Sequence, residues 1–105
     1  MILDDLFQTI QSRKSAEPTS SYTASLFHRG RNRIAQKVGE EATETVIAGV
    51  TNDIEHVKSE SANLLYHLLV LWADCGITPN DVFDVLKSRE GVSGITEKQN
   101  RKKEI

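Results

Sequence analysis

The sequence predicts an all-α protein, and three observations indicate that fold class. Nearly every apolar periodicity has the three- to four-residue spacing of a helix. No segment alternates apolar and polar residues for long enough to predict a strand. The 105 residues include only 2 prolines and 6 glycines, too few for a loop-rich chain. Because the connections between helices are short, we expect an antiparallel helical bundle, formed by a single domain over residues 1–105.

The first part of the chain predicts two short helices. The apolar stripe of the first consists of Ile2, Leu3, Leu6, Phe7 and Ile10. Residues 14–20 interrupt it, because Pro18 lies there among serines and threonines. The second short helix covers residues 22–28, and Gly30 is a plausible C-cap.

Two longer helices follow. The first covers about residues 32–51, and its apolar stripe consists of Ile34, Ala35, Val38, Ala42, Val46, Ile47 and Val50. A glycine inside a helix costs about 1 kcal/mol relative to alanine. Gly39 therefore indicates a close approach of a ligand or another helix. The turn at 51–53 provides N-cap chemistry for the second long helix, Ile54–Cys75, which Gly76 ends.

A last helix follows Thr78, its N-cap, and has Pro79 in its first turn. Its apolar face consists of Val82, Phe83, Val85 and Leu86. Gly91 and Gly94 then bracket a loop before a basic tail.

Residues 64–72, with the sequence LLYHLLVLW, are apolar nearly all round and interrupted only by His67. Such a helix must be buried on every side. It is either the central helix of a monomeric bundle or is buried against its copy in a homodimer, and we favour the homodimer. We expect His67 to be a hydrogen-bonded core histidine, Tyr66 and Trp72 to lie in the core or dimer interface, and Cys75 to serve packing.

Composition excludes several classes of protein. A formal net charge of −2 and a pI near 5.9 argue against a generally basic nucleic-acid binder. A single cysteine, Cys75, excludes an intramolecular disulfide and a multi-cysteine zinc site. No apolar run reaches the roughly 18 residues of a membrane span. We therefore expect a cytoplasmic protein with neither a nucleic acid nor a membrane as partner.

Acidic residues gather on the two long predicted helices. The first carries Glu40, Glu41 and Glu44, whose EExxE spacing places them within about one turn of one another. The second carries Glu60 and Asn63, one turn apart. If these helices are antiparallel neighbours, the two motifs can face each other. Carboxylate and amide oxygens suit Mg²⁺, although a glutamate-rich helix face is more often a solvated surface.

Four segments together resemble the phosphoribosyl-ATP pyrophosphohydrolase family, which acts at the second step of histidine biosynthesis. They are SYTASLF (21–27), IAQKVGEEATETVIA (34–48), ESANLLYHLLVLW (60–72) and SGITEKQNRK (93–102). The resemblance extends from about residue 3 to residue 103, with the blocks in the expected order and separation.

This resemblance implies an all-α, Mg²⁺-dependent, at least dimeric enzyme of the nucleoside-triphosphate pyrophosphohydrolase superfamily. The implied reaction is hydrolysis of phosphoribosyl-ATP to phosphoribosyl-AMP and pyrophosphate. Family sites combine EExxE with ExxD, so Asn63 departs from the pattern by replacing an aspartate with a neutral amide. Either the metal site is weaker, or this position supports Glu60 without touching the metal.

The resemblance also implies residue roles. The expected Mg²⁺ ligands are Glu41, Glu44, Glu60 and Asn63. The expected catalytic residues are Glu40, Glu41 and Glu44, with Glu40 the first candidate to orient or deprotonate water. The expected phosphate-binding residues are Lys37, Arg33, Arg89, Lys98 and Arg101. Two alternatives stay open: a hydrolase of non-standard nucleotides that uses the same metal site, and a catalytically weak dimeric helical module.

Overall fold

The computed structural model describes residues 1–90, which contain five α-helices and no strand, as the sequence predicts. In chain order they are α1 (Ile2–Ser12), the 3₁₀ turn η1 (Arg13–Ser15), α2 (Tyr22–Arg29), α3 (Arg31–Val50), α4 (Ile54–Cys75) and α5 (Pro79–Ser88). The segment predicted as a loop at 14–20 thus begins within η1. The predicted loop at 91–94 and the basic tail lie outside the described residues.

Local capping chemistry sets the helix boundaries. The Asp53 carboxylate accepts a hydrogen bond from the backbone N–H of His56 at the start of α4. Gly76 ends α4 with a left-handed φ of 77°, a conformation that costs glycine little. Thr78 and Asp81 form a reciprocal capping box at the start of α5, with bonds of 3.2 and 2.8 Å. These caps confirm the predicted boundaries.

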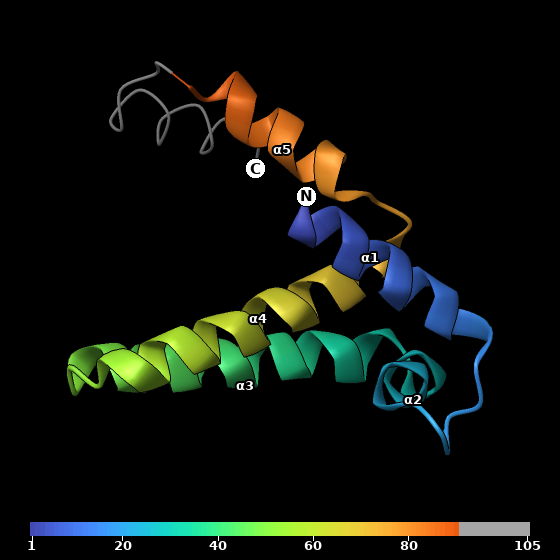
Figure 1. Cartoon of the computed structure of the whole chain (residues 1–105), viewed down its shortest axis with the longest axis horizontal. Coiled ribbons are helices and arrows are strands. Elements are labelled where there is room, and N and C mark those ends of the chain that lie inside the picture. The colour runs from blue at the N-terminus through green and yellow to red at the C-terminus, as the bar shows by residue number, and fades with distance from the viewer. Residues whose placement is uncertain (91–105) are drawn as a thin grey trace.

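The long helices α3 and α4 run antiparallel, side by side, and α1 and α2 cover one end of this pair (Figure 1). α1 packs on α4, and α2 packs mainly on α3. The buried core consists of Phe7, Ile10, Leu26, Ile34, Leu69, Val70 and Ala73. On the long pair, these residues belong to the first turn of α3 and the last turns of α4. The other end of the α3–α4 pair has no such core among the described residues.

Much of the predicted apolar surface is exposed in the single chain. Of the stripe predicted for α3, Ile34 is buried, whereas Val46 and Val50 are 62 % and 78 % exposed. In the 64–72 stretch His67, Leu69 and Val70 are buried, but Leu65 is 44 % exposed. The expectation that this stretch is buried on every side is therefore not met by one copy of the described chain.

Three smaller predictions have clear outcomes. Tyr66 and Trp72 are partly buried against the core, as expected. The packing role expected for Cys75 is wrong: the thiol is exposed, because Cys75 is the last residue of α4, two positions beyond the core residue Ala73. A Cβ at Gly39 would meet nothing within 4 Å, so no close approach within the described chain requires this glycine.

No helix among residues 1–90 is both long and apolar enough to cross a membrane.

Candidate active site

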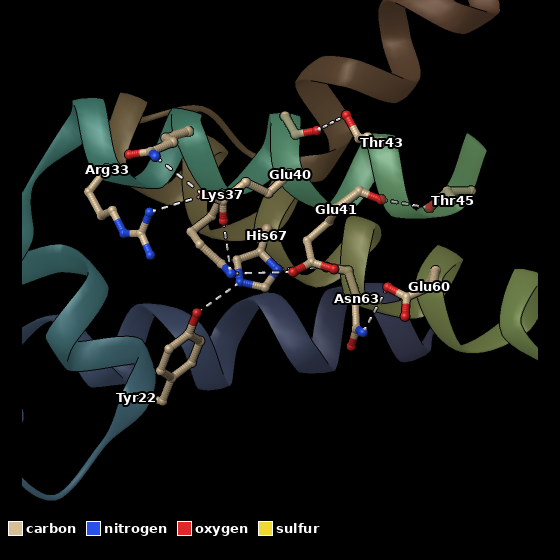
Figure 2. Close-up of polar contacts among 12 residues, drawn as sticks. Tyr22, Arg33, Lys37, Glu40, Glu41, Thr43, Thr45, Glu60, Asn63 and His67 are labelled. Carbon is tan, nitrogen blue, oxygen red and sulfur yellow. Dashed lines mark hydrogen bonds and ion pairs between the residues drawn. The ribbon is translucent and has the colours of Figure 1, made fainter. Parts of the chain in front are cut away.

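Lys37 connects two of the three glutamates of the EExxE motif on α3. Its ammonium nitrogen lies 3.3 Å from Oε2 of Glu40 and 3.4 Å from Oε1 of Glu41. The side chains of Lys37 and Glu41 are 18 % and 14 % exposed, and that of Glu40 is 44 % exposed. Figure 2 shows that Glu41 points toward α4, on the side where Asn63 lies. Glu41 therefore lies between the two helices.

Glu40 accepts hydrogen bonds from three neighbours on the same helix. Besides Lys37, Arg33 donates through Nη1 at 3.4 Å and Gln36 donates through Nε2 at 3.3 Å. The hydrogen bond from Lys37, followed by the charges of Lys37 and Arg33, lowers the pKa of Glu40. Partial burial alone would lower the pKa of Lys37, but its bonds to Glu40 and Glu41 and the nearby Tyr22 raise it. Both groups are therefore charged at neutral pH.

On α4, a chain of polar contacts runs from Glu60 to the start of α2. Nδ2 of Asn63 donates to Oε2 of Glu60 at 3.4 Å. Nδ1 of His67 lies 2.8 Å from the backbone carbonyl oxygen of Asn63, and Nε2 lies 3.2 Å from the hydroxyl of Tyr22. His67 is 5 % exposed, so the prediction of a hydrogen-bonded core histidine is confirmed.

Glu44 and Glu60 come from different helices but line the same pocket near the turn between α3 and α4. Its lining also includes Ile47, Ala48, Thr51, Asp53 and His56. The pocket thus brings one carboxylate from each acidic motif to a common opening. Within residues 1–90, however, no three His, Cys, Asp or Glu side chains gather closely enough to hold a metal ion.

The predicted phosphate-binding cations are distributed unevenly. Lys37 and Arg33 lie at the acidic motif, and the Nε of Arg33 is buried without a hydrogen-bond partner in the described structure. Arg89 caps the end of α5, a helix that diverges from the α3–α4 pair (Figure 1). Lys98 and Arg101 lie outside the described residues.

Tyr22 and Gln36 also contact the site, although neither belongs to the site residues predicted from the sequence. Gln36 was detectable from spacing, because it stands four residues before Glu40 on the same helix. Tyr22 was not detectable in this way, since its contact with His67 spans 45 residues of sequence.

Comparison with known proteins identifies the family. A sequence model described as "Phosphoribosyl-ATP pyrophosphohydrolase" matches residues 3–90. A protein of Azospirillum brasilense named "Phosphoribosyl-ATP pyrophosphatase" is 60 % identical over 101 residues, which cover 96 % of this chain and 91 % of the relative. The chain belongs to the phosphoribosyl-ATP pyrophosphohydrolase family.

Two further relatives have the same name as the first. The protein of Paramagnetospirillum magneticum is 55 % identical over 102 residues, covering 97 % of this chain and 94 % of the relative. That of Rhodospirillum rubrum is 54 % identical over 102 residues, covering 97 % and 87 %. The matched range, residues 3–90, contains both acidic motifs, Lys37, Tyr22 and His67. The resemblance noted in the sequence is thereby confirmed.

Proposed function

We propose that this chain hydrolyses phosphoribosyl-ATP between the α and β phosphorus atoms, giving phosphoribosyl-AMP and pyrophosphate, the second step of histidine biosynthesis. Family membership and the names of the relatives support this activity. The observation that carries it is the arrangement of charges on α3 and α4. EExxE, with its paired Lys37, lies on one helix, and Glu60 and Asn63 lie on the antiparallel neighbour.

The chain's own residues address the charge of the substrate. The negative charge of a triphosphate disfavours attack by the electron-rich oxygen of water unless cations balance that charge. Lys37 supplies one cation, and its raised pKa keeps it protonated. Arg33 supplies another, because its side chain is 28 % exposed and its guanidinium group lies beside Glu40 at the acidic motif.

Glu40 is the residue that we assign to the attacking water. Its lowered pKa keeps the carboxylate ionised, so that it can accept a hydrogen bond from water, but makes it a weak proton acceptor at neutral pH. Glu40 therefore suits orientation of the water better than complete removal of its proton. The Glu40 side chain is also more exposed than that of Glu41, which supports its contact with water.

We assign Glu41, Glu44, Glu60 and Asn63 as the residues that would hold Mg²⁺. Their donor chemistry fits, because all four offer the hard oxygen ligands that Mg²⁺ prefers. The pocket shared by Glu44 and Glu60 supports this assignment. Asn63 donates to Glu60 through its amide nitrogen, so its carbonyl oxygen Oδ1 remains to face a cation. When bound, Mg²⁺ would neutralise non-bridging phosphate oxygens and stabilise the pyrophosphate leaving group.

We further propose that the active protein is a homodimer that completes the helical bundle. Val46, Ile47, Val50, Ile54 and Leu65 are between 44 % and 78 % exposed, and all lie on the α3–α4 pair. Isolated exposed apolar residues are ordinary, but a group of this size on one pair of helices indicates an interface. A second copy offers the same apolar surface and is therefore a complementary partner.

The test of the activity is pyrophosphate release from phosphoribosyl-ATP, measured beside a panel of standard and non-standard nucleoside triphosphates. We expect Mg²⁺-dependent release with a clear preference for phosphoribosyl-ATP. Preference for a non-standard triphosphate would replace the proposal with the nucleotide-hydrolase alternative. No release from any substrate would favour the catalytically weak helical module.

A further inference from the structure

Tyr22 is held firmly although much of it faces solvent. The residue is 55 % exposed, yet its hydroxyl lies 3.2 Å from Nε2 of His67. Its ring stacks on that of Tyr66 at 6.4 Å with an interplanar angle of 24°, and meets the His67 ring edge-on at 6.1 Å. The neighbouring Thr23 is also hydrogen-bonded to the Tyr66 hydroxyl. The first turn of α2 is therefore fixed to α4 on its inner side.

The direction of the Tyr22 hydrogen bond follows from the contacts of His67. A backbone carbonyl can only accept, so Nδ1 of His67 carries the hydrogen that is donated to Asn63. In the neutral ring, Nε2 is then the acceptor, and the Tyr22 hydroxyl donates to it. Because His67 is buried, this acceptor cannot move far. The bond fixes the orientation of the exposed tyrosine ring.

The position of Tyr22 relates it to the phosphate-binding side chains. Figure 2 shows its hydroxyl directed toward His67 and the ammonium group of Lys37, on the opposite side of that group from Glu60. A ligand with phosphates at Lys37 and the acidic motifs would therefore have Tyr22 beside one end of its polyphosphate. Phosphoribosyl-ATP carries a purine base, whose flat apolar face needs a partner at such a position.

We propose, on the basis of the function proposed above, that the exposed Tyr22 ring stacks against the purine base of the substrate. In this assignment Tyr22 is a specificity-determining residue and His67 is the positioning residue that holds it. A tyrosine required only for packing would be buried, whereas this residue is 55 % exposed and its hydroxyl and ring contacts are made with α4. An aromatic ring that is already ordered loses little conformational entropy when a base stacks on it.

The first experiment compares Tyr22→Ala and Tyr22→Phe in the full chain. We expect Tyr22→Ala to raise KM for phosphoribosyl-ATP about tenfold, equivalent to about 1.4 kcal/mol, with kcat changed much less. Tyr22→Phe keeps the ring but loses the hydrogen bond to His67, so it should raise KM less than Tyr22→Ala does and by about as much as His67→Leu does. Inhibition by pyrophosphate, which has no base, should be unchanged in both variants. His28→Ala is the matched control, because it changes an exposed side chain of the same helix and should leave KM unchanged.

The second experiment tests whether His67 acts through Tyr22. We expect His67→Leu to raise KM in the wild-type background but to have little further effect in the Tyr22→Ala background. His67→Gln retains an acceptor for the tyrosine hydroxyl and should restore part of the affinity. A purely structural role of His67 would instead give additive effects and no rescue by glutamine.

Calorimetric binding of phosphoribosyl-AMP separates this inference from the proposed activity, because it requires no turnover. Weaker binding to Tyr22→Ala than to wild type supports stacking even if wild type does not release pyrophosphate. Equal binding by both proteins would overturn the inference even if wild type is fully active. Two other outcomes would also overturn it. One is a rise in the inhibition constant of pyrophosphate as large as the rise in KM. The other is a change of assembly in Tyr22→Ala, measured by sedimentation, while its affinity for substrate is intact.

Discussion

Lys37 and Glu41 form an ion pair along α3, with 3.4 Å between the ammonium nitrogen and Oε1, and both side chains are mostly buried. Pairs on an open surface contribute little to stability, because water and salt screen them. This pair is less screened, and removing one partner leaves a partly buried charge. Lys37 therefore orders the acidic motif before any ligand arrives, in addition to its proposed contact with phosphate.

Replacing Lys37 with glutamine should lower kcat/KM for phosphoribosyl-ATP by at least about tenfold, or ~1.4 kcal/mol, because a charge-assisted phosphate contact is lost. Steady-state kinetics and thermal unfolding are the measurements. Lys58→Gln is the matched control, since Lys58 pairs with Glu55 on an open surface where the side chains are 68 % and 83 % exposed. Unchanged kinetics in Lys37→Gln would remove Lys37 from the phosphate-binding residues.

Glu41→Gln or Glu44→Gln should abolish Mg²⁺-dependent hydrolysis while the helical circular-dichroism spectrum stays intact. Each change removes a negative charge from the proposed metal ligands without changing the shape of the side chain. Glu55→Gln, which makes the same change at an exposed glutamate of α4, is expected to keep full activity. Full activity in both motif variants would refute the assigned ligands.

Asn63→Asp tests the departure from the family pattern. If Asn63 contacts the metal directly, the added charge should raise the apparent Mg²⁺ affinity by a factor of about ten, or ~1.4 kcal/mol. If Asn63 only supports Glu60, the new carboxylate replaces the 3.4 Å hydrogen bond with repulsion, and affinity stays level or falls. Titration of Mg²⁺ against initial rate for the two proteins distinguishes these outcomes.

Removal of His56 should destabilise the protein in a pH-dependent way. A side-chain hydrogen bond to Asp53 raises the pKa of His56 above its ordinary 6.5, and the same bond lowers the pKa of Asp53 below its ordinary 3.8. The histidine contribution is fully present below pH 6.5 and is lost as pH rises through the raised pKa. The aspartate contribution is present above pH 3.8 and is lost as pH falls through the lowered pKa.

The difference in thermal midpoint between wild type and His56→Gln should therefore be largest between pH 3.8 and 6.5 and should shrink above that window. High salt should reduce the difference, because the pair is exposed. A difference that does not vary with pH would show that His56 contributes through packing rather than through its charge.

Sedimentation at micromolar concentration should give twice the chain mass of 11.7 kDa. The interface of an obligate homodimer commonly buries about 2,000 Å² or more of surface in total. In the proposed dimer, Val46→Asp buries a charge in the interface and should dissociate or unfold the protein. In a monomer Val46 would be an exposed surface residue, and the same change would alter the free energy of unfolding by only about 0.5 kcal/mol. Ser59→Asp, at an exposed polar position of α4, is the control. A stable monomer in the wild-type protein would contradict the proposed assembly.

Local chemistry made the helices predictable. The boundaries of α4 match the sequence-based expectation because Asp53 and Gly76 act on backbone groups within a few residues of themselves. The EExxE motif was equally visible, since side chains three and four positions apart on a helix are neighbours whatever surrounds them. The family resemblance depends on the order and spacing of such local blocks and could also be stated without a structure.

Contacts between distant segments were decided only by the tertiary structure. Tyr22 meets His67 across 45 residues, and Arg31 pairs with Asp74 at 2.5 Å across 43. No periodicity encodes these partners, because they depend on how α2 and the start of α3 pack on α4. The exposure of Val46 is likewise non-local: the pattern marks it as apolar, but whether another surface covers it depends on where the remaining helices lie. The sequence alone therefore determined the helices and their acidic motif, and the packing of the helices determined which side chains join that motif.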